Sequence, residues 1–351
     1  MTSVPLDTPL VSLIVPNKNN EPELDLFLST LRDHTTYPRV ELIVVDDGST
    51  DRSREILRRW RDSGAFPVFK LVERESSGII ETLNAGLAEA SGEIVVRLDG
   101  DATIETPGWL ERMLSFYRSD ERVGVLVAKI VFDSGHVHSY GMNVVGPAGV
   151  HDRGTRLTEP VGRRTLDINV ERPLEADSEG GDELAEIDGA IGCCTMFSRE
   201  LAERIGGFDT IYNPVGFEDF DFALGARRLG RKVFFFPEVE VVHRLTLRNP
   251  RTDGSRAEWL LWRLRRRMGG LFPQSVRNVV ARAARLGDHD PERIALLRRH
   301  YESWRRKWGF DPLNPDMDEV LRRYGGTEVC WRYDEERRRA GEEIIARWRA
   351  A

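Results

Sequence analysis

Short apolar segments alternate with amphipathic ones over the first part of the chain, and this alternation restricts the possible folds more than any other feature. The apolar segments predict strands, and the amphipathic segments, with apolar residues three and four positions apart, predict helices. The predicted strands are Val11–Pro16, Val40–Val45, Val68–Val72 and Ile94–Leu98, and the helices between them are Glu21–His34, Ser53–Arg61 and Gly78–Glu89. Strands that alternate with helices form crossover connections and a mostly parallel sheet. We therefore expect residues 1–104 to form an α/β nucleotide-binding half.

The fourth predicted strand ends in an acidic tripeptide, Asp99-Gly100-Asp101. Two carboxylates one residue apart repel each other and gain little from burial, so they add little to the stability of a strand end. In open α/β sheets, ligands bind beyond the carboxyl ends of the strands. A divalent cation between these carboxylates and a ligand would explain the pair. A solvated turn is the alternative, because Asp and Gly both favour turns.

Residues 105–250 continue the pattern of strands and helices around one long irregular region. The predicted elements are the helix Pro107–Ser119, the strand Val123–Val131, an ordered segment Ile187–Phe197, the helices Arg199–Ile205 and Phe217–Leu229, and the strands Lys232–Phe236 and Val239–His243. Residues 134–188 are rich in Gly, Pro and acidic residues, and long loops of this kind carry function or mobility. We therefore expect residues 1–250 to form one domain with a long variable region.

Residues 251–351 are predicted to form a basic α-helical extension. Basic residues outnumber acidic ones here, although the whole chain has a net charge of −7. The predicted helices are Arg256–Met268, Val276–Leu286, Pro291–Trp308, Asp316–Tyr324 and Tyr333–Trp348. The first combines aromatic residues with arginines, which suits either a membrane surface or the phosphates of a ligand. Packing on the core or on a neighbouring subunit of a homo-oligomer is the favoured interpretation, because its apolar face is aromatic.

The composition excludes several classes of protein. A hydrophobic fraction of 40% and a charged fraction of 31% are typical of a soluble globular chain. No apolar run is long enough to span a bilayer, and the N-terminus has no secretion signal. The three cysteines form neither a disulfide framework nor a zinc pattern, which favours the cytoplasm, with its inner membrane face as an alternative. No nucleic-acid motif is present, so we expect no nucleic-acid partner.

Seven motifs occur in an order that resembles the family 2 glycosyltransferases, which are inverting enzymes of the GT-A fold. They are Val11-Ser-Leu-Ile-Val-Pro16, Val44-Val-Asp-Asp-Gly-Ser-Thr-Asp51, Ser77-Gly78 with Asn84-Ala-Gly86, Leu98-Asp-Gly-Asp101, Gly206-Gly-Phe-Asp209, Phe217-Glu-Asp-Phe-Asp221 and Val242-His243. The resemblance covers roughly residues 10–245 and leaves out the C-terminal extension. It implies a GT-A sheet, with a nucleotide-binding half at residues 1–104 and an acceptor-binding half at residues 105–250.

The resemblance implies a nucleotide-sugar donor, UDP- or dTDP-linked, and a divalent cation, Mn²⁺ or Mg²⁺. The residues that it places at the donor are Pro16, Asn17, Asp46, Asp47, Asn84, Asp99 and Gly100. Asp46 and Asp47 would accept hydrogen bonds from the base and the ribose, although acidic residues before a helix are also favoured by its dipole. Asp99 and Asp101 match the DxD metal motif of the family, and His243 would complete the metal shell. His243 could equally be a structural residue.

The acidic segment that begins with Glu218 is implied to hold the catalytic base. Asp219 would take the proton of an acceptor hydroxyl as the new bond forms, because such a hydroxyl has a high pKa. Glu218 and Asp221 would bind or orient the acceptor, or Asp221 would hold the start of the helix. Stabilisation by the helix dipole is the structural alternative for at least one of these acids.

One departure from the family pattern follows Pro16. The family often has an aromatic residue and Asn here, whereas this chain continues Asn17-Lys18-Asn19, which leaves the donor nucleotide open. We predict a metal-dependent transferase that moves a sugar to a hydroxyl of a cell-surface polysaccharide or a lipid-linked glycan. The alternatives are a natural-product or peptide acceptor, or a non-catalytic module that binds sugar nucleotides.

Overall fold

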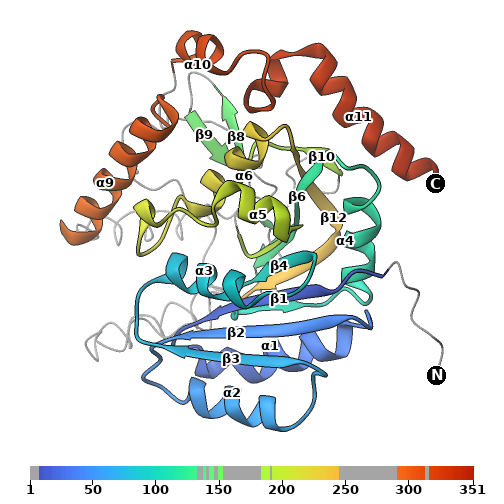
Figure 1. Ribbon diagram of the computed structural model, residues 1–351, viewed down its shortest axis with the longest axis vertical. Helices are drawn as coiled ribbons and strands as arrows, with labels where there is room; N and C mark the ends of the chain where they lie inside the picture. Colours follow the sequence, from blue (N-terminus) through green and yellow to red (C-terminus); the bar gives the residue numbers. More distant parts are fainter. Residues whose placement is uncertain are drawn as a thin grey trace, which may run out of the picture.

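A computed structural model describes residues 8–132, 137–139, 142–145, 149–152, 183–189, 192–244, 291–312 and 316–351. Its centre is a twisted sheet with helices on both faces, and three C-terminal helices lie along one end of the molecule (Figure 1). The predicted basic helix Arg256–Met268 lies outside the described residues, so its membrane or subunit contact stays a prediction. Among the described helices, none is both long enough and apolar enough to cross a membrane.

The N-terminal half confirms the predicted alternation of strands and helices. Its strands are β1 (Val11–Asn17), β2 (Val40–Asp47), β3 (Phe69–Arg74) and β4 (Ile94–Leu98), and its helices are α1 (Glu21–His34), α2 (Ser53–Asp62) and α3 (Ile79–Glu89). β1 pairs in parallel with both β2 and β4, and β2 pairs in parallel with β3. The carboxyl ends of these strands therefore meet at one edge of the sheet.

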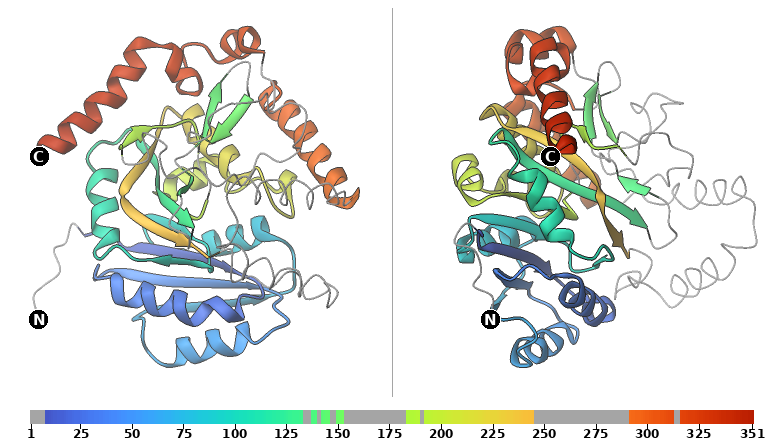
Figure 2. Two further views of the ribbon diagram at one scale, coloured as in Figure 1. Left: turned by 180° about the vertical axis from the view of Figure 1, so that it is seen from behind. Right: turned by 90° about the vertical axis from the view of Figure 1, so that its right-hand side faces the viewer.

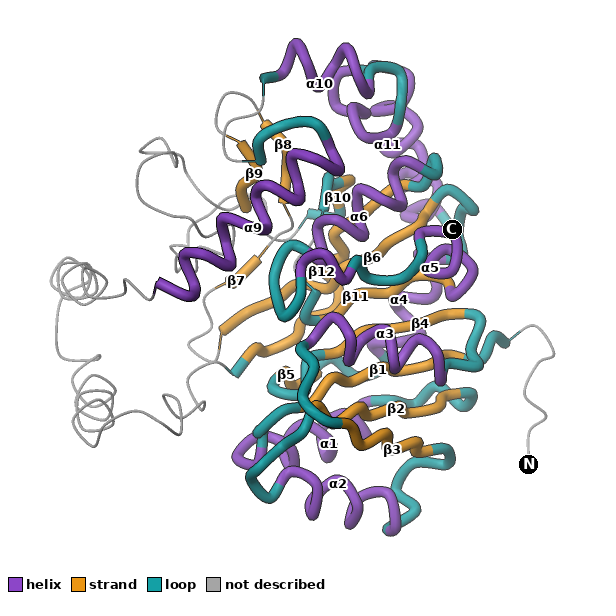
Figure 3. Tube along the Cα trace, turned by 60° about the vertical axis from the view of Figure 1, so that its left-hand side comes forward, coloured by secondary structure: helices purple, strands orange, loops and turns teal. Residues whose placement is uncertain are grey.

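The second half of the sheet is mixed rather than parallel. It adds β5 (Ala102–Ile104), β6 (Val123–Phe132), β10 (Ala185–Glu186), β11 (Cys194–Ser198) and β12 (Lys232–His243). β11 lies antiparallel between β4 and β6, and β12 pairs in parallel with β6 (Figure 3). β5 pairs antiparallel with the end of β12, which brings His243 opposite Ala102. The helices here are α4 (Trp109–Tyr117), α5 (Arg199–Ile205) and α6 (Glu218–Arg228).

Alternating side chains of the sheet supply two hydrophobic cores, one on each face. In β1, Leu13 and Val15 belong to the core under α1, α2 and α4, whereas Ile14 belongs to the core under α3, α5 and α6. This follows from the two-residue period of a strand. Strands that are covered on both faces have continuous apolar sequences, and this is why these strands could be recognised in the sequence.

The C-terminal helices lie at one end of the molecule (Figure 2). Their side chains belong to both cores rather than to a separate one. They are α9 (Pro291–Trp308), α10 (Met317–Tyr324) and α11 (Glu335–Ala350), with a short 3-10 segment at Glu328–Tyr333. In α9, Trp304 is fully buried and stacks on Phe220 of α6 with ring centroids 5.5 Å apart. In α11, Trp348 packs edge-on against Phe116 at 5.4 Å. The extension is therefore built onto the helix that carries the predicted base.

Three local predictions differ from the structure. β5 was not predicted as a separate strand, because it has only three residues and its partner lies far along the chain. The strands predicted at Lys232–Phe236 and Val239–His243 form a single strand, β12, in which a register shift after Phe236 takes up Pro237, Glu238 and Val239. The region 134–188 contains the short strands β7 (Val137–Ser139), β8 (Met142–Val145) and β9 (Gly149–Asp152), where no regular structure was predicted.

Candidate active site

The end of β2 carries Asp47, whose carboxylate is surrounded by donors of the protein itself. It accepts hydrogen bonds from the backbone N–H groups of Ser77 at 2.6 Å and Gly78 at 3.2 Å, and from Lys18 Nζ at 3.1 Å. Burial alone would raise the pKa of this carboxyl, but the bonds from Ser77 and Lys18 outweigh it and hold the pKa below its ordinary value. Asp47 therefore fixes the loop before α3. Lys18, which belongs to the segment that departs from the family pattern after Pro16, is one of the donors that hold Asp47.

Asp46 is engaged in the same way and is fully buried. Its carboxylate accepts from Arg54 Nε at 2.6 Å, from the Ser49 backbone N–H at 3.0 Å and from Asn17 Nδ2 at 2.9 Å. These bonds overcome the effect of burial and lower the pKa of Asp46. The carboxylate thus ties the turn after β2 to the ends of β1 and α2.

Of the remaining residues predicted at the donor, Pro16, Asn17 and Gly100 lie at these strand ends and Asn84 does not. A Cβ on Gly100 would lie 3.5 Å from the carbonyl oxygen of Pro16 and 3.1 Å from Asn20 Nδ2, so a side chain there would crowd the end of β1. Asn17 Oδ1 is buried and has no hydrogen-bond partner among the described residues. Asn84 lies elsewhere: its amide donates to the carbonyl of Phe208 and accepts from the Phe208 N–H, both at 2.8 Å.

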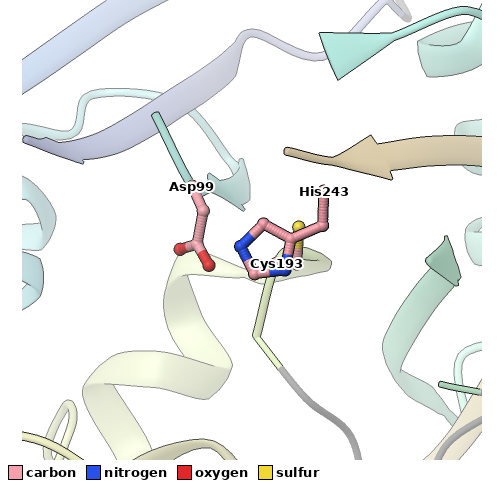
Figure 4. Close-up of side chains that lie close together, drawn as sticks. All are labelled: Asp99, Cys193 and His243. Atoms are coloured by element: carbon pink, nitrogen blue, oxygen red, sulfur yellow. The ribbon is translucent and has the colours of Figure 1, made fainter. Parts of the chain in front are cut away.

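Asp99, Asp101 and His243 come together at the end of β4, as the metal prediction requires. His243 Nε2 lies 3.3 Å from Asp101 Oδ1, because β5 pairs with the last residues of β12. Asp101 is 1% exposed, whereas the side chain of Asp99 is 21% exposed. Cys193 was not predicted here. Donor atoms of Asp99, Cys193 and His243 all lie within 4.8 Å of one another (Figure 4).

The first turn of α6 brings two further carboxylates to this edge. Asp219 Oδ2 accepts from the Gly192 backbone N–H at 2.9 Å, and Glu218 Oε2 accepts from the Gly216 N–H at 2.7 Å. Phe217 begins the helix with φ +71, a left-handed conformation that is unusual for a bulky residue. Its ring packs among aromatic rings that include Trp304 of α9 at 5.9 Å. This unusual turn sets where the two carboxylates emerge.

Arg97 is a central residue of the site that the sequence analysis missed. It is only 3% exposed, contacts Asp219, and has guanidinium nitrogens 3.4 Å from Asp99 and 3.7 Å from Glu218. One available signal was its position, since it is the single charged residue inside the apolar strand β4. Arginine almost never enters a buried strand without carboxylate partners.

Asp221 lies away from this cluster, in the contact between α6 and α9. Its carboxylate accepts from Lys307 Nζ at 2.7 Å, from Trp308 Nε1 at 2.8 Å and from the Tyr212 hydroxyl at 3.2 Å. Burial raises the pKa of Asp221 and the Lys307 cation opposes that shift. Of the two roles that the sequence suggested for Asp221, these contacts resemble the structural one, because they join the helix to the extension.

The β4 end has more negative than positive charge. The guanidinium of Arg97 is shared by three carboxylates, those of Asp99, Glu218 and Asp219. The imidazole of His243 lies beside Asp99, where both could bind the same cation. Carboxylate oxygens with an imidazole suit Mn²⁺ and neighbouring divalent ions. The donor set therefore fits a divalent cation at Asp99 and His243, with Asp101 orienting the imidazole as carboxylates commonly do in metal sites.

The fold, with acidic residues at the carboxyl ends of β2 and β4, is of the GT-A type. The model of the family "Glycosyl transferase family 2" matches residues 12–206, more than half of the chain. The chain therefore belongs to glycosyltransferase family 2. The O-antigen biosynthesis protein RfbC of Myxococcus xanthus is 27% identical over 237 residues, which cover 67% of this chain. The chain spans only 17% of the length of RfbC.

Two solved structures share the fold. The mannosyltransferase PcManGT of Pyrobaculum calidifontis, in complex with GDP-Man and Mn²⁺, has a TM-score of 0.50 at 22% identity and covers 87% of this chain and 89% of its own. GalNAc-T7 with UDP, GalNAc and Mn²⁺ also has a TM-score of 0.50, at 16% identity, over 68% of this chain and 44% of its own. These similarities confirm the predicted GT-A fold, and the structure itself shows the C-terminal helices α9, α10 and α11.

Proposed function

We propose that the protein is an inverting, metal-dependent glycosyltransferase that moves a sugar from a nucleotide-diphosphate donor to a hydroxyl acceptor. One observation carries the proposal: carboxylates from β4 and α6 converge around Arg97, beside His243, at the carboxyl edge of the sheet. This edge is where ligands bind in open α/β sheets. Membership of family 2 supports the same reaction.

The donor would lie along the ends of β1, β2 and β4. We propose that Asp46 and Asp47 act by fixing the two loops that border the nucleotide, because their oxygens are already used by protein donors. The buried Asn17 Oδ1 is an acceptor left over for a donor group of the base or the ribose. A UDP- or dTDP-sugar is the donor that we propose, and GDP-sugars belong in the same test because PcManGT was solved with GDP-Man.

A divalent cation would be held by Asp99 and His243, with Asp101 as a further ligand or as the group that orients the imidazole. When bound, such an ion acts as a Lewis acid that stabilises charge on the leaving diphosphate. Mn²⁺ is the proposed ion, with Mg²⁺ as the alternative. Both GT-A structures named above contain Mn²⁺.

Asp219 is the proposed general base. Its carboxylate is held by the Gly192 N–H and by Arg97, and its side chain is 20% exposed, so a hydroxyl can reach it. As the hydroxyl oxygen forms a bond to the anomeric carbon, its proton passes to Asp219 and the bond from that carbon to the diphosphate breaks. Attack on the face opposite the diphosphate inverts the anomeric configuration. Glu218, held by the Gly216 N–H, would orient the acceptor.

The acceptor is the least constrained part of the proposal. We propose a cell-surface polysaccharide or a lipid-linked glycan, which the O-antigen role in the name of RfbC supports. Residues 1–250 would form the catalytic unit, and residues 251–351 would form an extension. The contacts of α9 with Phe217 and Asp221 support a role for the extension in holding the first turn of α6.

A screen of nucleotide sugars, with and without Mn²⁺, tests the proposal. A donor at 100 times its Kd should stabilise the protein by about 2.7 kcal/mol, which thermal unfolding detects. The donor that gives the largest Mn²⁺-dependent shift should then be turned over, slowly by water and faster with an acceptor, releasing nucleoside diphosphate. A donor that binds with Mn²⁺ but is never consumed, with any acceptor glycan, would instead indicate a binding module.

A further inference from the structure

The cysteine beside the proposed metal site is placed there by backbone pairing. β4 and β11 are antiparallel, with Cys194 opposite Leu98, and the next pair is joined by a 3.0 Å hydrogen bond from the Asp99 N–H to the Cys193 carbonyl. This bond lies just beyond the ladder, because β4 ends at Leu98 and β11 begins at Cys194. The backbone therefore holds Cys193 next to Asp99, whatever rotamer the two side chains adopt.

The neighbouring cysteine is outside this group of donor atoms. Cys194 is the first residue of β11 and lies opposite Leu98, whereas Cys193 precedes the strand in a turn. Both thiols are fully buried. Of the two, only Cys193 joins the group of donor atoms that includes Asp99 and His243, all within 4.8 Å of one another (Figure 4). The two cysteines thus form a matched pair, with one at the site and one outside it.

The surroundings of Cys193 argue against a nucleophilic or redox role. The thiol is fully buried and lies beside the carboxylate of Asp99 and the imidazole of His243. A reactive cysteine needs a lowered pKa and access to solvent, because the thiolate is the nucleophile. A buried thiol among carboxylates and an imidazole has another use, since a bound cation would offset the repulsion between a thiolate and these acids.

We propose that Cys193 is a metal ligand, which gives the site an Asp–His–Cys donor set and makes it prefer Zn²⁺ and Co²⁺ over Mg²⁺. The inference rests on the metal site of the proposed function and names a ligand that the DxD pattern does not contain. Oxygen-only sites suit Mg²⁺, and carboxylates with an imidazole also suit Mn²⁺, whereas an added thiolate ligand favours softer ions such as Zn²⁺. Cys193 would therefore determine which divalent ion the protein selects.

The test is to titrate the metal-free full-length protein with Co²⁺ alone and record its absorption. A thiolate ligand produces a sulfur-to-cobalt charge-transfer band in the near ultraviolet. We expect this band in the wild type and in Cys194→Ser, and its loss in Cys193→Ser. The double variant Cys194→Ser/Cys330→Ser retains Cys193 as its only cysteine and should keep the band, so the test stands even if Cys193→Ser fails to fold.

Metal competition gives the second readout. In Cys193→Ser the affinity for Zn²⁺ should fall by at least about tenfold, while the affinity for Mg²⁺ changes less. Co²⁺ that binds the wild type without the band, or a band that survives in folded Cys193→Ser, overturns the proposal. Mn²⁺-dependent donor binding is measured on the same preparations. If it persists without the band, the assignment of Cys193 fails while the proposed function stands.

Discussion

The chain places acidic pairs at the carboxyl ends of two strands, β2 and β4, and the two pairs have opposite surroundings. At β2, Asp46 and Asp47 accept hydrogen bonds from donors of the protein: backbone N–H groups, serine hydroxyls, an amide, a lysine and an arginine. At β4, Asp99 shares Arg97 with Glu218 and Asp219 and lies beside His243. The β2 pair stabilises the surrounding loops, and we propose that the β4 pair binds an added cation.

The difference shows that an acidic motif at a strand end does not by itself identify a ligand site. A carboxylate has about four lone-pair positions, and once protein donors fill them it stabilises a loop. A group of carboxylates that outnumbers its cations costs free energy unless a ligand or a proton neutralises it. The number of hydrogen-bond donors around each carboxylate, rather than the acidic motif, distinguishes the end of β2 from the end of β4. The following predictions test that separation.

The largest expected effect is on the chemical step. Asp219→Asn keeps the shape of the side chain but removes the proton acceptor, so the transfer rate should fall by about 10²–10⁴-fold. Donor affinity should change little, because the proposed donor contacts lie at β1, β2 and β4. Single-turnover transfer and donor binding, measured on the same folded sample, check this. An equal loss of donor binding would make Asp219 a binding or structural residue, and near-normal transfer would move the base to Glu218.

The next effect is on stability and concerns the other strand end. Asp47→Ala leaves the N–H groups of Ser77 and Gly78 and the Lys18 cation without their acceptor. Leaving such groups unsatisfied costs about 1–3 kcal/mol, which urea unfolding should detect. Asp99→Ala is the matched control, and it should cost less because it relieves repulsion among the carboxylates. A larger loss of unfolding free energy in Asp99→Ala than in Asp47→Ala would contradict the contrast between the two strand ends.

A site residue could be predicted from the sequence when its role does not depend on partners far away along the chain. Asp99, Asp101 and His243 could be proposed together because they match motifs of the family that the sequence resembles. Arg97 and Cys193 were missed, because their roles depend on β11 and α6, which lie far along the chain. Asp221 could not be placed for the same reason, since its partner Lys307 is 86 residues away. The longer helices and strands were predictable because their apolar periods are local, whereas short strands such as β5 were not.

The smallest effect is the acid dependence of stability. The folded-state pKa of Asp47 lies below its unfolded value of about 3.9, so its contribution is present above that pH and is lost as the pH falls through the folded pKa. The unfolding free energy of the wild type should therefore decrease on acidification below about pH 4. Asp47→Asn should show a shallower decrease in urea unfolding over the same range. An unchanged slope would mean that Asp47 is not held ionised by these bonds.

The central claim is that the β4 end, and not the β2 end, binds the metal. Calorimetric titration of Mn²⁺ into the wild type, Asp99→Asn and Asp47→Asn tests it most directly, with thermal unfolding of each variant as the folding control. We predict that Asp99→Asn loses at least about tenfold in Mn²⁺ affinity with little change in unfolding temperature. Asp47→Asn should keep its Mn²⁺ affinity and unfold at a lower temperature. Unchanged Mn²⁺ binding by folded Asp99→Asn, or its loss in folded Asp47→Asn, would contradict the account.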